Sequence, residues 1–185
     1  MVDRYYRNLV IPKFDQRLCN SLTTLALSII DRGLCNDYEY THVDHLRFYD
    51  PRNDIPELVD IKNDCNIRAG INLFFLPPNS TMPVHRDQNV GGKRGCSIAL
   101  PVLPHTDISP TNWYEHTDSI MPSAYAHWEQ HKPKLINMLE LHNVSTGKAW
   151  RCNLQISLDR EYDTVVDMIQ SQSLFKTISV VLDNG

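Results

Sequence analysis

A stretch near the N-terminus has the hydrophobic spacing of an amphipathic helix. Between residues 15 and 31, large apolar residues recur three or four positions apart and so share one helical face. They are Leu18, Leu22, Leu25 and Ile29. Asp15 stands where its carboxylate can cap the first turn, and Gly33 stands where a left-handed residue can end the helix. The pattern predicts a helix over 15–31, within a helical N-terminal part of residues 1–35.

From residue 68 onward the pattern changes to short apolar or aromatic runs, which are separated by Pro, Gly, Asn and Asp. These runs are 69–76, 96–103, 112–114, 134–141 and 150–158. Short strands at this spacing are typical of a β-sandwich or barrel. We therefore expect a mainly β protein with flanking helices, whose β core covers about residues 69–158.

The segments between these elements give weaker signals. Residues 35–64 are polar, with short candidate strands at 38–42 and 45–49 and a turn-rich stretch at 51–56. Residues 104–133 are rich in Pro, His and aromatic residues and show no clear period, so part of this segment is expected to be a loop. Long loops on a β scaffold often carry substrate contacts.

Two elements are expected near the C-terminus, a short helix over 162–170 and a last strand over 177–182. The sequence contains no internal repeat, low-complexity tract or linker. We therefore expect a single domain over residues 1–185.

Composition and charge restrict the classes of partner. The chain is 42% hydrophobic and 22% charged, as in an ordinary globular protein. The formal charge is −4 and the basic residues are scattered, so no nucleic-acid partner is expected. Five cysteines without a Cys-x-x-Cys pair fit a reducing compartment. No apolar run reaches the roughly 18 residues that a membrane span needs. A cytoplasmic protein without a membrane partner follows, while the oligomeric state stays open.

The strongest chemical signal is the sequence His85-Arg-Asp87. Residues two apart in a strand point to the same face, so this pair can present an imidazole and a carboxylate to one metal ion. His142, which follows Asp87 by 55 residues, can supply a third ligand. Two histidines and one carboxylate are the facial triad of non-haem Fe(II) oxygenases, which leaves open positions on the metal. The alternative is a pair of solvated surface residues.

Arg151, nine residues after His142, adds a second signal. It begins a run in which apolar residues alternate with polar ones, so one face of the expected strand is apolar and the other carries the arginine. A fixed guanidinium beside a metal suits a dicarboxylate, because it forms a bidentate, charge-assisted pair with one carboxylate. The alternative is a surface ion pair with Glu140 or Asp159.

Together these residues resemble the pattern of the 2-oxoglutarate and Fe(II)-dependent oxygenases. His85, Asp87, His142 and Arg151 match the family's His-x-Asp, distal His and following Arg, and the match covers roughly residues 69–158. The resemblance implies a double-stranded β-helix, a jelly-roll or cupin-like fold. It also implies Fe(II) held by the three ligands, with 2-oxoglutarate as cosubstrate and O2 as oxidant. The implied reaction hydroxylates a C–H bond of an amino acid, a peptidyl residue or a small metabolite, and releases succinate and CO2.

Within this superfamily the chain looks most like the aspartyl/asparaginyl β-hydroxylase-like branch. An arginine nine residues after the first metal histidine helps to bind the cosubstrate there, and Arg94 holds that position here. The chain departs from the branch at Asp87, where the branch has Gly, and at Cys96, where it has a further histidine. Asn72 is a further candidate for a cosubstrate contact, with a hydrogen bond inside the sheet as its alternative.

A different class of function also fits this sequence. A cupin-like module can keep a metal site, for example with Zn or Mn, in a binding or structural role without oxygenase turnover.

Overall fold

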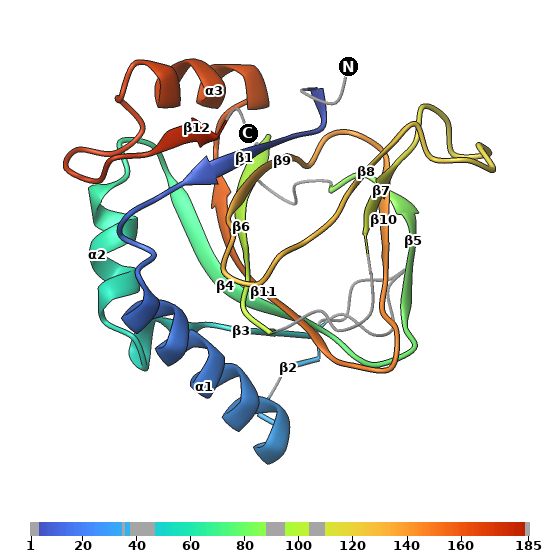
Figure 1. Ribbon diagram of the computed structural model, residues 1–185, viewed down its shortest axis with the longest axis horizontal. Helices are drawn as coiled ribbons and strands as arrows, with labels where there is room; N and C mark the ends of the chain where they lie inside the picture. The colour runs from blue at the N-terminus through green and yellow to red at the C-terminus, as the bar shows by residue number, and fades with distance from the viewer. Residues whose placement is uncertain (1–3, 35, 38–46, 88–94, 104–109, 184–185) are drawn as a thin grey trace.

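Two antiparallel sheets form the body of the protein (Figure 1). The computed structural model describes residues 4–34, 36–37, 47–87, 95–103 and 110–183. The eight-stranded sheet has the order β12 (Val181–Asp183), β1 (Tyr6–Val10), β9 (Lys134–Asn137), β6 (Cys96–Pro101), β11 (Arg151–Leu158), β4 (Ala69–Leu76), β3 (Arg47–Tyr49) and β2 (Asn36–Asp37). The four-stranded sheet has the order β5 (Thr81–His85), β10 (His142–Ser145), β7 (Thr111–Trp113) and β8 (Ala124–Ala126).

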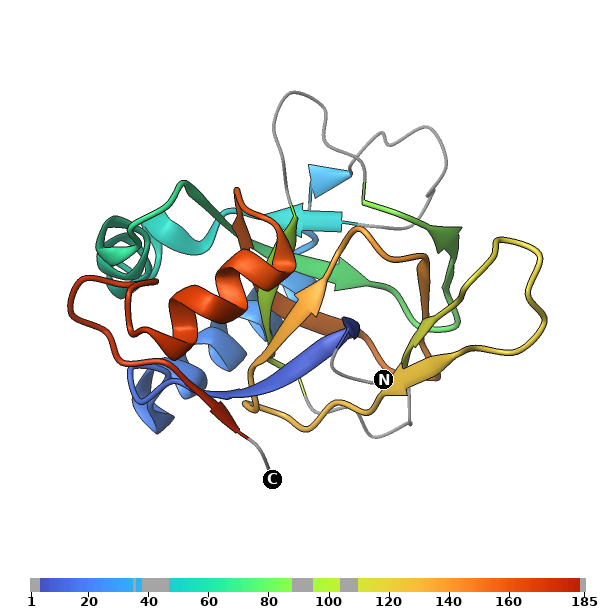
Figure 2. The same ribbon diagram turned by 90° about the horizontal axis from the view of Figure 1, so that it is seen from above.

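The chain passes back and forth between the two sheets. β4 lies in the large sheet, β5 in the small one and β6 in the large one again, and β9, β10 and β11 repeat this alternation. In Figure 2 the small sheet is seen beside the large one at one end of the molecule. This is the double-stranded β-helix, or jelly roll, that the resemblance implies, so the expected fold class is confirmed.

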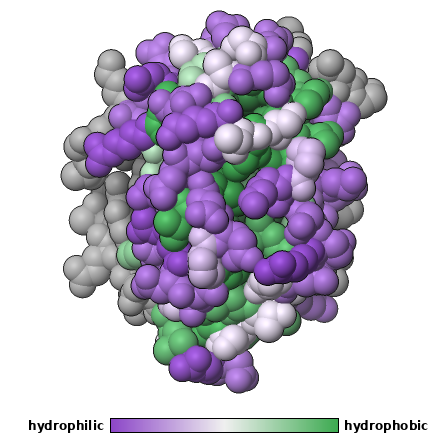
Figure 3. All heavy atoms as spheres, turned by 90° about the vertical axis from the view of Figure 1, so that its left-hand side faces the viewer, coloured by the Kyte–Doolittle hydropathy of each residue, from purple (hydrophilic) through white to green (hydrophobic). Residues whose placement is uncertain are grey.

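Within the described residues, three α-helices cover the outer face of the large sheet, and a short 3-10 helix, η2 (Pro51–Asn53), precedes the second of them. The α-helices are α1 (Gln16–Arg32), α2 (Glu57–Asp64) and α3 (Tyr162–Gln170). The Asp15 carboxylate accepts a hydrogen bond from the Leu18 N–H at 2.8 Å, and Gly33 ends α1 with φ of 62°, as the sequence predicts. Apolar side chains of all three helices pack with those of β4, β6 and β11 in one buried cluster. The side of the molecule that carries the helices is mostly hydrophilic on its surface (Figure 3).

The two faces of β11 differ as the alternation predicts. Cys152, Leu154 and Ile156 are buried in the cluster under the helices. The residues between them, which begin with Arg151, therefore point into the space between the sheets. A second, smaller cluster fills part of that space, and it consists of Tyr5, Ala99, Trp113, Ala124, Ala126, Trp128, Ile136 and Met138.

Several elements differ from the sequence prediction. The polar segment 35–64 contains α2, which the prediction lacks, because its eight residues bury only Leu58 and Ile61. β1 and β8 were also not predicted. β9 ends at Asn137 rather than at residue 141, and His142 begins the next strand. The predicted strand 45–49 is observed at 47–49, and 38–42 lies outside the described residues.

None of the helices in the described part of the chain is long and apolar enough to span a membrane. Four of the five cysteines, Cys19, Cys65, Cys96 and Cys152, are buried free thiols, as a reducing compartment would allow. Cys35 lies outside the described residues.

Candidate metal centre

The two predicted metal histidines stand side by side on the small sheet. His142 on β10 is the register partner of His85 on β5, and on its other side it pairs with Trp113 on β7. Register partners project from the same face, so the three side chains form one row across the sheet. The neighbouring pair Asn112 and Asn143 is joined by a side-chain hydrogen bond of 3.0 Å. Because Trp113 belongs to the cluster between the sheets, the row faces inward.

Pro83 explains the local shape of the strand that carries His85. Proline has no N–H to donate to a neighbouring strand, and the pairing of β5 with β10 shifts register between His142 and Val144. The Pro83 carbonyl is 2.7 Å from Nδ1 of His85. The contact with the Pro83 carbonyl orients the His85 ring.

Asp87 joins the two histidines from beyond the end of β5. Its Oδ1 lies 3.1 Å from Nε2 of His85 and 3.9 Å from Nε2 of His142. Its N–H donates to the Met138 carbonyl at 3.1 Å. The ligand atoms of the three residues all lie within 4.8 Å of one another. The sequence argument placed Asp87 in the same strand as His85, but Asp87 lies beyond the end of β5. Its carboxylate still reaches both histidines.

Backbone carbonyls fix which imidazole nitrogen is available. Nδ1 of His85 contacts the Pro83 carbonyl, and Nδ1 of His142 contacts the Glu140 carbonyl at 2.8 Å. A carbonyl only accepts, so each Nδ1 must carry the hydrogen. The lone pair of each neutral ring is then on Nε2, the nitrogen closer to Asp87. This is the orientation in which a histidine binds a metal.

The pKa values of the two histidines shift in opposite directions. Burial lowers the pKa of His142, although the Asp87 carboxylate opposes this; the charges of His85 and Arg151 lower it further. Burial also lowers the pKa of His85, but hydrogen bonds with Asp87 and the Pro83 carbonyl outweigh it, so this pKa is raised. A metal binds imidazoles in their neutral form. A metal at this site would therefore take the place of the proton that Asp87 stabilises on His85. Two imidazoles and a carboxylate therefore fit a divalent transition metal such as Fe(II).

Arg151 is buried, with 5% of its surface exposed, at the start of β11. Its Nη2 donates to the Thr111 hydroxyl at 3.1 Å, and its guanidinium lies 5.4 Å from the centre of the Trp128 ring. Burial lowers its pKa to about 9. Arginine still stays protonated at neutral pH, so a positive charge is held between the sheets, where an anion would stabilise it. The alternative of a surface ion pair is wrong, and Glu140 pairs with Arg4 instead.

Three residues of this region were not singled out as site residues by the sequence. Thr111 accepts hydrogen bonds both from Arg151 and from Nε1 of Trp128, the latter at 3.0 Å. Lys134 is only 9% exposed, and its ammonium lies 5.9 Å from the Trp128 ring centre. Alternation along β9 was the available signal for Lys134, because Leu135 packs under the helices. A buried lysine is rare enough that the local pattern alone does not predict it.

The remaining predicted residues are placed less directly. Asn72 lies on β4 opposite Gln155, on the inward face, and within the described chain its side chain makes no hydrogen bond. The alternative of a hydrogen bond inside the sheet is therefore not observed. Arg94 lies outside the described residues. Cys96 packs under the helices, and its Sγ contacts the Arg160 carbonyl at 3.7 Å, so it faces away from the histidine row.

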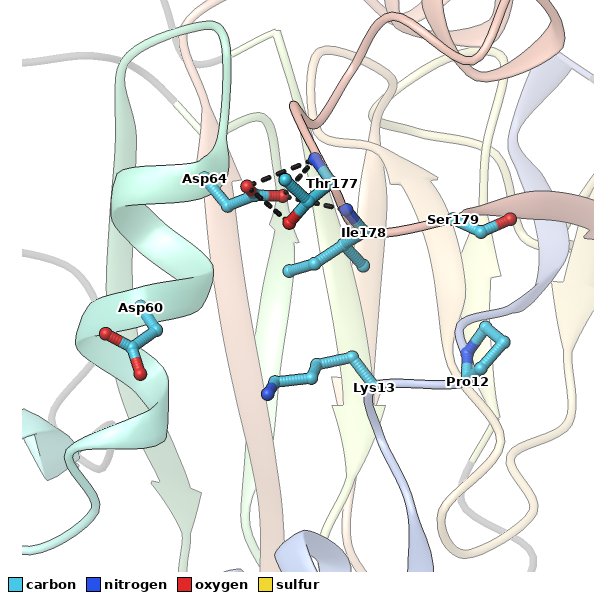
Figure 4. Close-up of a pocket in the computed structure, with 7 residues that line it drawn as sticks. All are labelled: Pro12, Lys13, Asp60, Asp64, Thr177, Ile178 and Ser179. Atoms are coloured by element: carbon cyan, nitrogen blue, oxygen red, sulfur yellow. Dashed lines mark hydrogen bonds between the residues drawn. The ribbon is translucent and has the colours of Figure 1, made fainter.

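A pocket of about 450 Å³ lies elsewhere, on the helix side of the molecule (Figure 4). It is lined by Pro12, Lys13, Asp60, Asp64, Thr177, Ile178 and Ser179. The Asp64 carboxylate already accepts hydrogen bonds from the backbone N–H groups of Thr177 and Ile178. The pocket has no residue in common with the histidine row.

Comparison with known proteins finds likeness in structure rather than in sequence. No family model and no curated protein matches the chain. A prolyl hydroxylase from Trichoplax adhaerens, in complex with a hypoxia inducible factor oxygen degradation domain peptide, has a TM-score of 0.61 and 10% identity over 88% of this chain and 87% of that chain. A Pseudomonas putida prolyl-4-hydroxylase has a TM-score of 0.53 and 13% identity over 84% and 94% of the two chains.

A third structure is HygX from Streptomyces hygroscopicus, with nickel and 2-oxoglutarate bound. Its TM-score is 0.50 at 9% identity, over 84% of this chain and 83% of that chain. At such identities the likeness is one of fold. The chain therefore has the jelly-roll fold found in 2-oxoglutarate-dependent oxygenases.

Proposed function

We propose that this protein is a 2-oxoglutarate-dependent Fe(II) dioxygenase that hydroxylates a C–H bond and releases succinate and CO2. The observation that carries the proposal is the cluster of three donors, His85, Asp87 and His142, whose ligand atoms lie within 4.8 Å. It occurs in a fold shared with HygX, whose structure holds nickel and 2-oxoglutarate. Fe(II) bound at this cluster would supply the activation of O2.

The three ligands have distinct tasks in this proposal. His85 and His142 bind through Nε2, because their Nδ1 atoms are held by carbonyls. Asp87 contributes the single negative charge, which partly neutralises a divalent ion. Three protein ligands leave further coordination positions for a bidentate cosubstrate and O2. A carboxylate ligand also favours hydroxylation over halogenation, since halogenases of this superfamily lack it.

Arg151 binds the far carboxylate of 2-oxoglutarate in this proposal. Arg151 donates to Thr111, whose register partner Val144 lies two residues after His142 on β10, so the anion site and the metal site are neighbours. Trp128 packs against the guanidinium and Thr111 accepts from it, which fixes its orientation. A fixed guanidinium pairs with a carboxylate through two parallel hydrogen bonds. Arg94 and Asn72 are proposed as further cosubstrate contacts.

The substrate is proposed as a class only: an amino acid, a peptidyl residue or a small metabolite. A peptidyl substrate has support from the Trichoplax adhaerens prolyl hydroxylase, whose structure contains a peptide. The alternative of a small metabolite has support from SnoN, a non-haem α-ketoglutarate-dependent epimerase of nogalamycin biosynthesis with a TM-score of 0.56 at 8% identity.

The deciding experiment adds Fe(II) and 2-oxoglutarate to the protein without oxygen. If 2-oxoglutarate chelates the iron, a weak visible charge-transfer band appears, and admitting O2 then produces succinate. A protein that binds metal but shows neither signal is the cupin-like binding module of the alternative. Screening candidate substrates for stimulated succinate release then identifies the substrate.

A further inference from the structure

The turn between β9 and β10 touches two of the three proposed metal ligands. The Met138 carbonyl accepts the Asp87 N–H at 3.1 Å. Two residues later, the Glu140 carbonyl contacts Nδ1 of His142 at 2.8 Å. Both carbonyls belong to the segment 138–141, so the shape of this turn sets where the carboxylate and the second imidazole lie.

The N-terminal segment holds this turn from outside. Nε and Nη2 of Arg4 donate to the two carboxylate oxygens of Glu140 at 2.8 and 2.7 Å. Nδ2 of Asn137 donates to the Arg4 carbonyl at 3.0 Å, and the backbone N–H of Asn137 donates to the Tyr5 carbonyl at 2.8 Å. The other end of the same amide, Oδ1 of Asn137, accepts the Leu139 N–H at 3.2 Å.

We infer that Arg4, Asn137 and Glu140 form a brace that positions His142 and Asp87 for the metal. The inference rests on the proposed metal site. Asn137 is the centre of the brace, because one amide group binds both the N-terminal segment and the turn. Arg4 adds a two-pronged ion pair to the residue whose carbonyl orients His142. These are positioning residues, since none of them contacts the metal ligands through its side chain.

The size of the effect follows from exposure. The Arg4 side chain is 58% exposed and that of Glu140 is 19% exposed, so solvent weakens their ion pair. Loss of a pair of this kind changes an equilibrium by about twofold to fivefold. Outer-shell groups that fix a metal ligand contribute about 10- to 100-fold in metal affinity. Asn137 acts on the ligands only through the backbone of the turn, so we expect a small loss of nickel affinity for Arg4→Ala and a larger loss, of at most about tenfold, for Asn137→Ala.

The test measures Ni(II) binding to the metal-free full chain by calorimetry, with the melting temperature of each metal-free variant as a second readout. Arg17→Ala is the matched control. It removes an exposed ion pair with Glu57 that joins α1 to α2, and it should leave nickel affinity unchanged.

Exchanging the charges tests whether the Arg4–Glu140 ion pair itself carries the effect, and a loss of nickel affinity larger than the change in melting temperature explains separates positioning from a merely structural role. Arg4→Glu should weaken nickel binding, and adding Glu140→Arg should restore it. Wild-type affinity in both Arg4→Ala and Asn137→Ala overturns the brace. Should Asn137→Ala fail to fold, the Arg4 variants still decide. If wild type itself binds no nickel, the proposed metal site fails, and the brace fails with it.

Discussion

Asp87 is the single anionic group of the proposed metal centre, and it lies within 3.9 Å of both imidazole Nε2 atoms. Without it, a divalent ion would meet two neutral ligands and no compensating charge. Because a carboxylate is the ligand that offsets the metal charge, its loss should exceed the effect of changing a group that only supports a ligand.

Asp87→Ala should therefore lower Fe(II) or Ni(II) affinity by more than the roughly 100-fold upper range of outer-shell changes, and should abolish 2-oxoglutarate turnover. His142→Ala should do the same. Metal content after dialysis and succinate release measure the two effects. Asp118→Ala, at an exposed position between β7 and β8, is the control and should keep both. Full turnover in either ligand variant would exclude this triad.

Arg151 separates cosubstrate binding from metal binding, because the guanidinium is not a ligand. Arg151→Lys keeps the charge but loses the two-pronged hydrogen bond. Loss of a charge-assisted pair in a partly dry site costs about 2–4 kcal/mol, or about 30- to 1,000-fold in affinity, with Lys near the lower end. The 2-oxoglutarate concentration for half-maximal turnover should rise accordingly, while nickel affinity stays at the wild-type value. Unchanged cosubstrate affinity with a less stable fold would make Arg151 a structural residue.

The site residues show which contacts the local sequence pattern can predict and which it cannot. Arg151 faces inward because alternation along its strand is regular, and that is visible in the sequence. Thr111 contacts Arg151 from β7, which belongs to the other sheet, and Lys134 shares with Arg151 only the Trp128 ring. The brace on the metal turn likewise joins Arg4 to Glu140, 136 residues away. Such contacts depend on the register of the folded sheets, which single-chain periodicity does not contain.

At the scale of elements, predictability follows the length of the regular pattern. α1 and α3 and the long strands β4 and β11 are apolar at a clear period, and all four were predicted within a residue or two of their ends. β8 has three residues and pairs with β7 alone, at the edge of the small sheet, so too few positions alternate to give a signal. The observed β12 begins at Val181, later than the predicted strand at 177–182.

The segment before β12 is held by α2 through one carboxylate. Asp64 accepts hydrogen bonds from the Thr177 hydroxyl at 2.8 Å and from the N–H groups of Thr177 and Ile178 (Figure 4). Burial raises the pKa of Asp64, but these hydrogen bonds outweigh it, and the pKa lies below its usual value. A lowered pKa in the folded state stabilises the protein above the unfolded pKa of about 3.9, and this stabilisation disappears as pH falls through the folded value.

Asp64→Asn should therefore lower the free energy of unfolding by about 1 kcal/mol at pH 7 and change it little at acidic pH, below both pKa values. Urea denaturation at the two pH values measures the difference. Asp118→Asn, at an exposed position between β7 and β8, is the control and should have no effect at either pH. If Asp64→Asn lowers the free energy of unfolding equally at both pH values, the charge of the Asp64 carboxylate does not contribute to this contact.

At the scale of the whole molecule, the two halves of the proposed site come from different sheets. His85 and His142 belong to the small sheet, with Asp87 just beyond β5, whereas Arg151 belongs to the large sheet. β1 and β12, near the two ends of the chain, both join the large sheet, which supports our proposal of a single domain. A cosubstrate that chelates the metal and pairs with Arg151 would then connect the two sheets.

This connection predicts a pattern of thermal stability with Ni(II) as a redox-inert substitute for Fe(II). A ligand present at 100 times its Kd stabilises the folded state by about 2.7 kcal/mol, which for a chain of this size raises Tm by about 5–10 °C. Nickel alone should raise Tm, and 2-oxoglutarate should raise Tm further only when nickel is present. In Arg151→Ala the nickel increment should remain and the 2-oxoglutarate increment should shrink by several degrees. Glutarate, which lacks the 2-oxo group, should add less than 2-oxoglutarate in wild type. A full 2-oxoglutarate increment in Arg151→Ala would mean that the cosubstrate is held by the small sheet alone, contrary to the proposed site.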